Sequence, residues 1–341
     1  MEAPATLDGF RGLFSESPYP RQWPHVATGL TYLRGIRVLA ELLGCEATEE
    51  AVFARRRTSD PDDYAAALLR ATRSEWLLVD VGFPQPGRGP GWRRMGELAG
   101  CAAAPVLRVE TLGDDGVARG LELDQLRELA RAEVAAARDH GYVALKTIAA
   151  YRSGLDVVPP DLRTAAQALA AGGTRVTAKP LIDLLLLDAL EANAADPLPV
   201  QIHCGFGDPD LMLPRANPGH LKPLIERFAT TPFVLLHCYP YVREAGWLAH
   251  VYANVFFDLS LTIPHVSRPD EMVRQALELA PTSKLLYASD AARAPELYPL
   301  AATWWREALA EVLGEALPAR EAEQAGRRVL RENALALYPL G

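Results

Sequence analysis

The chain has 341 residues, is about half apolar and carries a formal net charge of −8. It is long enough to bury one large core, and single α/β barrels of this length are common. Acidic and basic residues are interspersed without a basic stripe, which argues against nucleic acid as a partner. No apolar run reaches the ~20 residues that span a bilayer, so no membrane partner is expected.

Four cysteines, Cys45, Cys101, Cys204 and Cys238, are widely spaced and form no CxxC pair. This spacing disfavours a disulfide framework and a structural zinc knuckle. The first thirty residues lack the basic stretch and apolar stretch of a secretory signal. A reducing, cytoplasmic location is therefore expected.

The N-terminal part of the chain has the pattern of helices joined by polar segments. Thr31–Leu43 carries apolar residues at helical spacing, and Thr48 begins a further helix. No strand pattern occurs there. We expect residues 1–72 to form a helical segment that packs on a barrel made by residues 73–341.

From Glu75 onward, short apolar runs alternate with longer helical patterns, which predicts a parallel sheet with helical crossovers. The expected strands are Glu75–Val81, Val106–Glu110, Val143–Ile148, Pro199–Cys204, Phe233–Cys238, Val255–Ser260 and Lys284–Ser289. Residues 299–335 are expected to form two closing helices. Seven strands are one fewer than a closed (β/α)₈ barrel and would also suit an open doubly wound sheet.

Side chains suited to metal binding stand at the ends of four predicted strands. They are Lys146, His203, His237 and Asp290. In a (β/α) barrel the carboxyl ends of the strands form the active-site mouth, so this repetition favours the barrel over the open sheet. Imidazole and carboxylate together suit a divalent ion, zinc first and manganese second.

This set of residues suits hydrolysis by a metal-activated water. Asp290 is expected to take the proton of the nucleophile, and His237, with the metal, to stabilise the oxyanion. Lys146 could ligate a cation only as a carbamate and would otherwise be an electrostatic partner. Both forms of Lys146 are open.

Further polar residues follow the strand ends and are candidates for substrate binding. They are Arg152, Asp208, Tyr239 and Arg243. A guanidinium can pair with a substrate carboxylate, which suggests an acidic or amino-acid-like substrate. Two other residues in such positions, Ser260 and His265, are interpreted as loop residues without a chemical role.

Several strings resemble the amidohydrolase superfamily: QIHCGFGDPDL, LLHCYPYVREAGWLAHVYANVFFDLSLTIP, KLLYASDA and RRVLRENALALY. They are most similar to the branch that also occurs fused to glutamine-synthetase-like domains in fungal and nodulin-type proteins. The resemblance runs from about Leu33 to the C-terminus. It implies a (β/α)₈ barrel with one or two divalent metals, in which the predicted strands are strands two to eight and Lys146, His203, His237 and Asp290 are metal ligands.

The chain departs from that pattern at the first strand, because it contains no His-x-His. We expect the motif upstream of the segment resembling Phe10–Pro18, so either the true start lies further upstream or half the site has been lost. The first alternative is favoured. On the residues present, at most one divalent ion is expected.

The sequence therefore predicts a TIM-like barrel that lacks its first strand and is preceded by helices. Its expected function is that of a metal-dependent hydrolase acting on a C–N amide, or ester, bond of a small polar substrate. Non-oxidative decarboxylation on the same fold is one alternative, and a non-catalytic barrel is another because the His-x-His is missing. A homo-oligomer and a glutamine-synthetase-like partner are left open.

Overall fold

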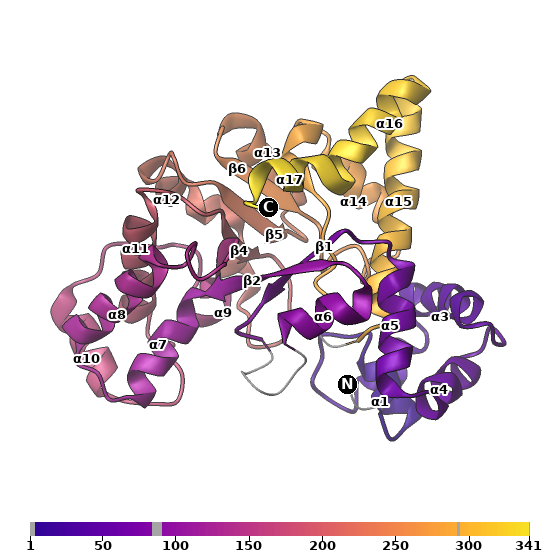
Figure 1. Ribbon diagram of the computed structural model, residues 1–341, viewed down its shortest axis with the longest axis horizontal. Coiled ribbons are helices and arrows are strands. Elements are labelled where there is room, and N and C mark those ends of the chain that lie inside the picture. The colour runs from indigo at the N-terminus through magenta and orange to yellow at the C-terminus, as the bar shows by residue number, and fades with distance from the viewer. Residues whose placement is uncertain (1–3, 84–90, 292–293, 341) are drawn as a thin grey trace.

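The fold is described from a computed structural model that covers residues 4–83, 91–291 and 294–340 (Figure 1). Its first part is helical, as expected. The helices are α1 (Leu7–Gly12), α2 (Trp23–Val26), α3 (Leu30–Leu43), α4 (Glu49–Thr58) and α5 (Pro61–Ala71). Thr48 caps α4 by accepting a hydrogen bond from the Ala51 amide, which satisfies one of the free N–H groups at the helix start.

Seven parallel strands then form one sheet. They are β1 (Trp76–Asp80), β2 (Ala102–Arg108), β3 (Ala144–Thr147), β4 (Val200–Cys204), β5 (Phe233–His237), β6 (Val255–Asp258) and β7 (Leu285–Leu286). Each strand pairs with the strands that precede and follow it in the chain. In a doubly wound sheet, by contrast, the order of the strands reverses at a switch point. The fold is a TIM-like (β/α) barrel, as predicted. In the described part of the chain, β1 and β7 each lack a strand on their outer edge.

Further helices follow the strands, and most of them cover the outside of the sheet. They are α6 (Trp92–Ala99), α7 (Val109–Ala118), α8 (Leu123–Ala135), α9 (Ala149–Arg152), α10 (Leu162–Ala170), α11 (Lys179–Asn193), α12 (Lys222–Arg227), α13 (Val242–Val251), α14 (Pro269–Ala276), α15 (Leu297–Ala316), α16 (Ala319–Arg327) and α17 (Asn333–Leu337). A π-helical turn, η4 (Arg328–Glu332), precedes α17. The second predicted strand ends earlier than expected, because Val109 and Glu110 begin α7. No helix among the described residues is both long and apolar enough to cross a bilayer.

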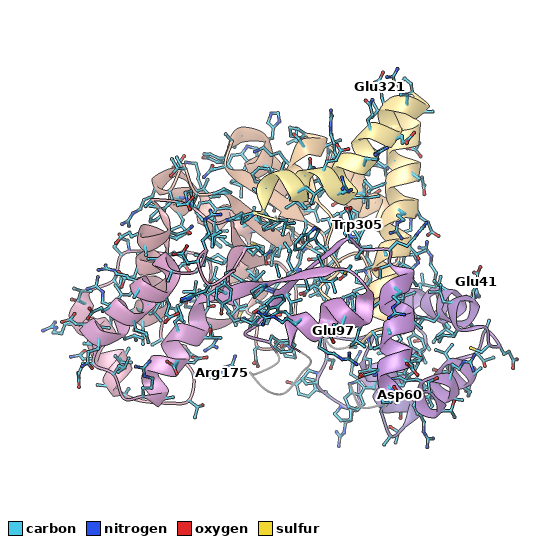
Figure 2. The ribbon with its side chains drawn as sticks, viewed as in Figure 1. Glu41, Asp60, Glu97, Arg175, Trp305 and Glu321 are labelled. Carbon is cyan, nitrogen blue, oxygen red and sulfur yellow. The ribbon has the colours of Figure 1, made fainter. Side chains whose placement is uncertain are left out.

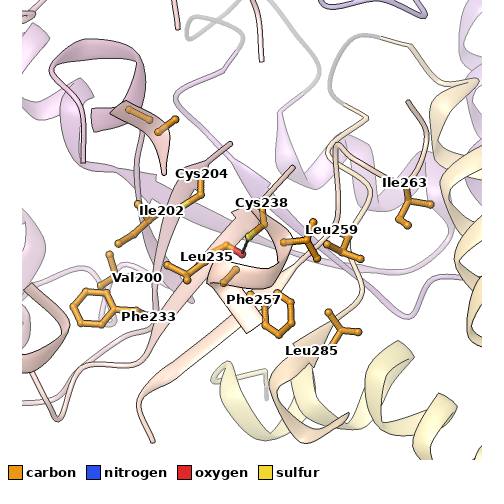
Figure 3. Close-up of a cluster of buried hydrophobic side chains, with 14 of the residues drawn as sticks. Val200, Ile202, Cys204, Phe233, Leu235, Cys238, Phe257, Leu259, Ile263 and Leu285 are labelled. Carbon is orange, nitrogen blue, oxygen red and sulfur yellow. Dashed lines mark hydrogen bonds between the residues drawn. The ribbon is translucent and has the colours of Figure 1, made fainter. Parts of the chain in front are cut away.

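The two faces of each strand serve different purposes. Along β4, Val200, Ile202 and Cys204 point into the apolar layer between sheet and helices (Figure 3). Gln201 and His203 point the other way, into the barrel, because alternate residues of a strand lie on opposite faces. Cys204 is completely buried and is a small residue of this core.

The C-terminal residues form the floor of the barrel. Leu337 and Tyr338 pack against inward-facing Val234 and Leu286. The Tyr338 hydroxyl accepts a hydrogen bond of 3.1 Å from the Gln201 amide. One end of the barrel is therefore filled with side chains, and chemistry is left to the other end.

A buried ion pair joins the N-terminal helices to the barrel. Arg56 of α4 pairs with Glu296, which precedes α15, and their side chains are 4% and 0% exposed. The Tyr64 hydroxyl of α5 donates to the same carboxylate at 3.0 Å. Helices α3 and α5 accordingly lie beside α15 (Figure 1). Figure 2 shows the opposite environment for Asp60, which is exposed at the periphery.

Candidate active site

One pocket occupies the mouth at the carboxyl ends of the strands. Lys146, His203, His237 and Asp290, the four predicted ligands, all line it. Its volume is about 1640 Å³, above the roughly 300–1,000 Å³ of most small-molecule sites. The excess arises because the pocket continues between the unpaired edges of β1 and β7 to the C-terminal residues. The structure therefore brings together the residues that the sequence places at four strand ends.

His203 and His237 are neighbours in this pocket. Their ring centroids are 4.6 Å apart, and the residues are 4% and 1% exposed. Among the described residues, neither Nε2 atom has a hydrogen-bond partner. Burial is the main reason why the pKa of each imidazole lies well below its usual value, and the charge of Lys146 adds to it. Both rings are therefore neutral at pH 7, with buried polar nitrogens that call for a ligand.

Asp290 lies close to this pair, with Oδ2 3.7 Å from the His237 Nε2. Its backbone has a φ of 49°, in the left-handed region that few non-glycine residues adopt. Trp305 of α15 donates a 3.0 Å hydrogen bond to the Ala288 carbonyl, which anchors the segment leading to Asp290. The carboxylate is thus held at the mouth by a loop with a defined backbone.

The backbone of His237 is also held in the left-handed region, with a φ of 68°. Its amide donates to the Asp258 carboxylate at 2.8 Å, and its carbonyl accepts from the Thr262 hydroxyl at 2.7 Å. A conformation of this kind costs about 1–3 kcal/mol and persists when the surroundings enforce it. The segment after β6 therefore positions His237.

The same segment contacts the His237 side chain through Ser260, a residue to which the sequence analysis assigned no role. The Ser260 Oγ lies 2.6 Å from the His237 Nδ1 and donates to the Asp258 carboxylate at 2.6 Å. Because the serine proton goes to Asp258, Nδ1 donates to Ser260 and Nε2 keeps its lone pair for the pocket. The Leu261 amide is 3.4 Å from Nδ1 and competes only weakly. Burial raises the pKa of Asp258 to about 6, so this carboxyl is ionised at neutral pH.

Replacing Ser260 with alanine is expected to weaken zinc binding about 10- to 100-fold, because Nδ1 would lose the partner that fixes the ring and its tautomer. Calorimetric titration of zinc measures the affinity, and the ¹⁵N shifts of His237 report the tautomer without reference to activity. Ser59→Ala, which removes a hydroxyl that donates to the Arg55 carbonyl at the end of α4, serves as control. An unchanged tautomer and affinity in the Ser260 variant would contradict this role.

A charged cluster stands on the other side of the mouth. Asp80, at the end of β1, accepts hydrogen bonds from Arg108 at the end of β2 and lies 3.2 Å from the Lys146 ammonium at the end of β3. Burial acts to raise the pKa of Asp80, but Lys146 and Arg108 hold it below its usual value. This ion pair fits the ammonium form of Lys146. The sequence analysis did not predict Asp80 and Arg108 as site residues, although each lies within a predicted strand.

The predicted substrate-binding residues are placed differently from one another. Arg152 lines the pocket but is engaged by Asp114 and by the Val176 carbonyl. Asp208 lines the pocket. Arg243 is 64% exposed and pairs with Glu278 on the outside of α13, so the structure does not support the expected substrate contact.

Tyr239 does not line the pocket either, and packs edge-on against Phe206. An aromatic residue that was not predicted for the site, Tyr151 of α9, does line it and packs against His203 at a tilt, with ring centroids 4.5 Å apart. Its hydroxyl accepts from the Asp208 amide at 3.3 Å. Gly207 makes room for it, because a Cβ there would lie 1.7 Å from the phenol oxygen.

The donor set fits a divalent ion only in part. Within the described residues, no group of three His, Cys, Asp or Glu side chains is gathered closely enough to hold a metal. His203 and His237 nevertheless present two unpartnered nitrogens, with Asp290 nearby. Two imidazoles and one carboxylate are the donors of many open zinc sites, so the residues suit one ion rather than two.

Comparison with known proteins identifies the family. The model of the family described as Amidohydrolase matches residues 89–340. The chain therefore belongs to the amidohydrolase family, which confirms the resemblance seen in its sequence.

Three individual proteins show how far the similarity extends. The chain is 38% identical over 226 residues to Protein fluG of Emericella nidulans, a match that spans 59% of this chain but only 26% of that protein. A structure from Lactobacillus casei, assigned as a metal-dependent hydrolase, is 30% identical with a TM-score of 0.88 and covers 98% of this chain and 90% of its own. Uronate isomerase from Thermotoga maritima, with a TM-score of 0.68 and 16% identity over 97% of this chain and 82% of its own, shares the fold.

Proposed function

We propose that this chain is a metal-dependent hydrolase of a C–N amide, or ester, bond in a small polar substrate. The observation that carries the proposal is the pair of buried imidazoles, His203 and His237, whose Nε2 atoms have no partner among the described residues and lie beside Asp290. Membership of the amidohydrolase family supports it.

Each residue of the mouth has a role in this proposal. A divalent ion, zinc or manganese, supplies a Lewis acid and lowers the pKa of water when bound. His203 and His237 would hold it through Nε2. Asp290 would accept the proton of the attacking water and return it to the leaving group. The Tyr151 hydroxyl, which packs closely against Gly207, would orient the substrate beside His203.

The proposal limits the number of ions. The chain contains no His-x-His, and the gap between β1 and β7 is where a further strand would add donors to the mouth. On the residues present, we propose one divalent ion bound through His203 and His237.

The test is hydrolysis of N-acyl amino acids and simple esters by the metal-free protein and by the protein loaded with zinc or manganese. Loaded protein should release the acid and amine, and Asp290→Asn should be at least about 100-fold slower because the proton acceptor is lost. Release of carbon dioxide without hydrolysis would favour the decarboxylase. Metal binding without any turnover would favour the non-catalytic barrel.

A further inference from the structure

Charge is unbalanced in the cluster at the ends of β1 to β3. Two cations, Arg108 and Lys146, share the single carboxylate of Asp80. The side chains are only 12%, 10% and 14% exposed, respectively. One positive charge is therefore left over in a place with little access to water.

The surrounding groups do not cancel this charge. Asp290 lies beside His237 instead, and no ion pair joins it to Arg108 or Lys146 among the described residues. The nearby Glu110 of α7 is buried, and its carboxylate accepts from the Thr147 hydroxyl and the Ile148 amide. Asp114 is paired with Arg152. Neither acid forms an ion pair with Arg108 or Lys146 among the described residues. A buried charge without a counter-ion is unfavourable, so such a cluster is suited to bind an anion.

The two cations, Arg108 and Lys146, lie at the wall of the pocket. Arg108 and Lys146 are opposite one another in the β2–β3 register, and all three members of the cluster line the pocket together with His203. Arg108 donates to Asp80 through Nε and one terminal nitrogen, and among the described residues its other terminal nitrogen has no hydrogen bond to a side chain or carbonyl. That nitrogen can donate to a second acceptor. An ammonium and a guanidinium side by side are the donors that bind carboxylates best.

We propose that Arg108 and Lys146 bind a carboxylate of the substrate, so that the bond to be cleaved belongs to a small carboxylate-bearing amide or ester. This inference rests on the proposed function and names its substrate class. It also assigns Lys146 as an ammonium rather than a carbamylated metal ligand. Arg108 and Lys146 thus take the place of Arg152 and Arg243 as the substrate anchors.

Binding to metal-free protein tests the inference separately from hydrolysis. N-acetylglycine, which carries the carboxylate, is titrated against N-acetylglycinamide, its uncharged counterpart. We expect the acid to bind at least about 10-fold more tightly than the amide. Equal affinities in the unmodified protein would overturn the proposal, whereas a failure of hydrolysis alone would overturn only the proposed function.

Two substitutions should shift this preference in opposite directions. Lys146→Met should abolish the preference for the acid, whereas Asp80→Asn should strengthen it because the competing carboxylate is removed. A purely structural role would not produce the gain in Asp80→Asn. Arg274→Met, which removes an exposed cation paired with Glu315, should leave the preference unchanged.

The state of Lys146 is checked by adding ¹³C-bicarbonate to the protein and recording its ¹³C spectrum. No lysine carbamate signal is expected in the unmodified protein. A carbamate signal that disappears in Lys146→Met would overturn the assignment of Lys146 as an ammonium. Retention of the acid preference by Lys146→Met would equally overturn its role as an anchor.

Discussion

His237→Ala is expected to lower the affinity for zinc at least about 100-fold, because it removes one of two imidazole donors from a site with few others. The Nε2 atom of His237 is buried without a hydrogen-bond partner among the described residues, and the centroids of the two imidazole rings lie 4.6 Å apart. Calorimetric titration of zinc into the metal-free variant measures the loss. His203→Ala should give the same result.

Two controls separate loss of the donor from loss of the fold. His250→Ala changes an exposed histidine of α13 and should bind zinc as the unmodified protein does. Circular dichroism should show that both variants of the mouth keep their helices. If His237→Ala and His203→Ala bound zinc normally, the ion would have to lie elsewhere and the proposed site would be wrong.

The second large effect concerns stability. Glu296→Ala should reduce the free energy of unfolding by about 3–5 kcal/mol, because it leaves the buried guanidinium of Arg56 without its partner. It also deprives the Tyr64 hydroxyl of its acceptor. Urea unfolding followed by circular dichroism gives the change.

The matched control is Glu307→Ala, which breaks an ion pair with Arg34 whose members are 54% and 41% exposed. Exposed pairs contribute about 0–1 kcal/mol, so this variant should unfold almost as the unmodified protein does. The double replacement Arg56→Met and Glu296→Leu should recover most of the stability, since it leaves no charge buried. A loss for Glu296→Ala no larger than for Glu307→Ala would show that Arg56 finds another partner or water.

The strands could be predicted because buried parallel strands are short apolar runs bounded by helices. The four ligand-type residues could be predicted because each stands at or near the end of such a run. Asp80 and Arg108 share that location, but their importance depends on the register that sets Arg108 opposite Lys146, and register is not readable from one strand. Ser260 was overlooked because its contact with His237 joins residues 23 positions apart. For Arg243, the second residue of α13, the sequence does not show which way the side chain points, and in the structure it pairs with Glu278.

The contact between Gly207 and Tyr151 is a second example of packing that the sequence does not show. Residues 205–208, with the sequence GFGD, follow directly on the end of β4. That a side chain at Gly207 would collide with Tyr151, 56 residues earlier, follows only from the packing of two loops. Local patterns therefore locate the mouth, and long-range packing decides which residues face into it.

The order in which the strands pair has a consequence for how the chain folds. Every strand lies next to its neighbour in sequence, so the sheet can grow one crossover at a time with modest loop-closure entropy. The link between Arg56 and Glu296 is different, because 240 positions separate its members. Helices α3 to α5 stand near the start of the chain, but α4 cannot form its ion pair with Glu296 until β7 and the segment after it have folded. We expect their amides to gain protection from hydrogen exchange last during refolding, after those of β2 to β5.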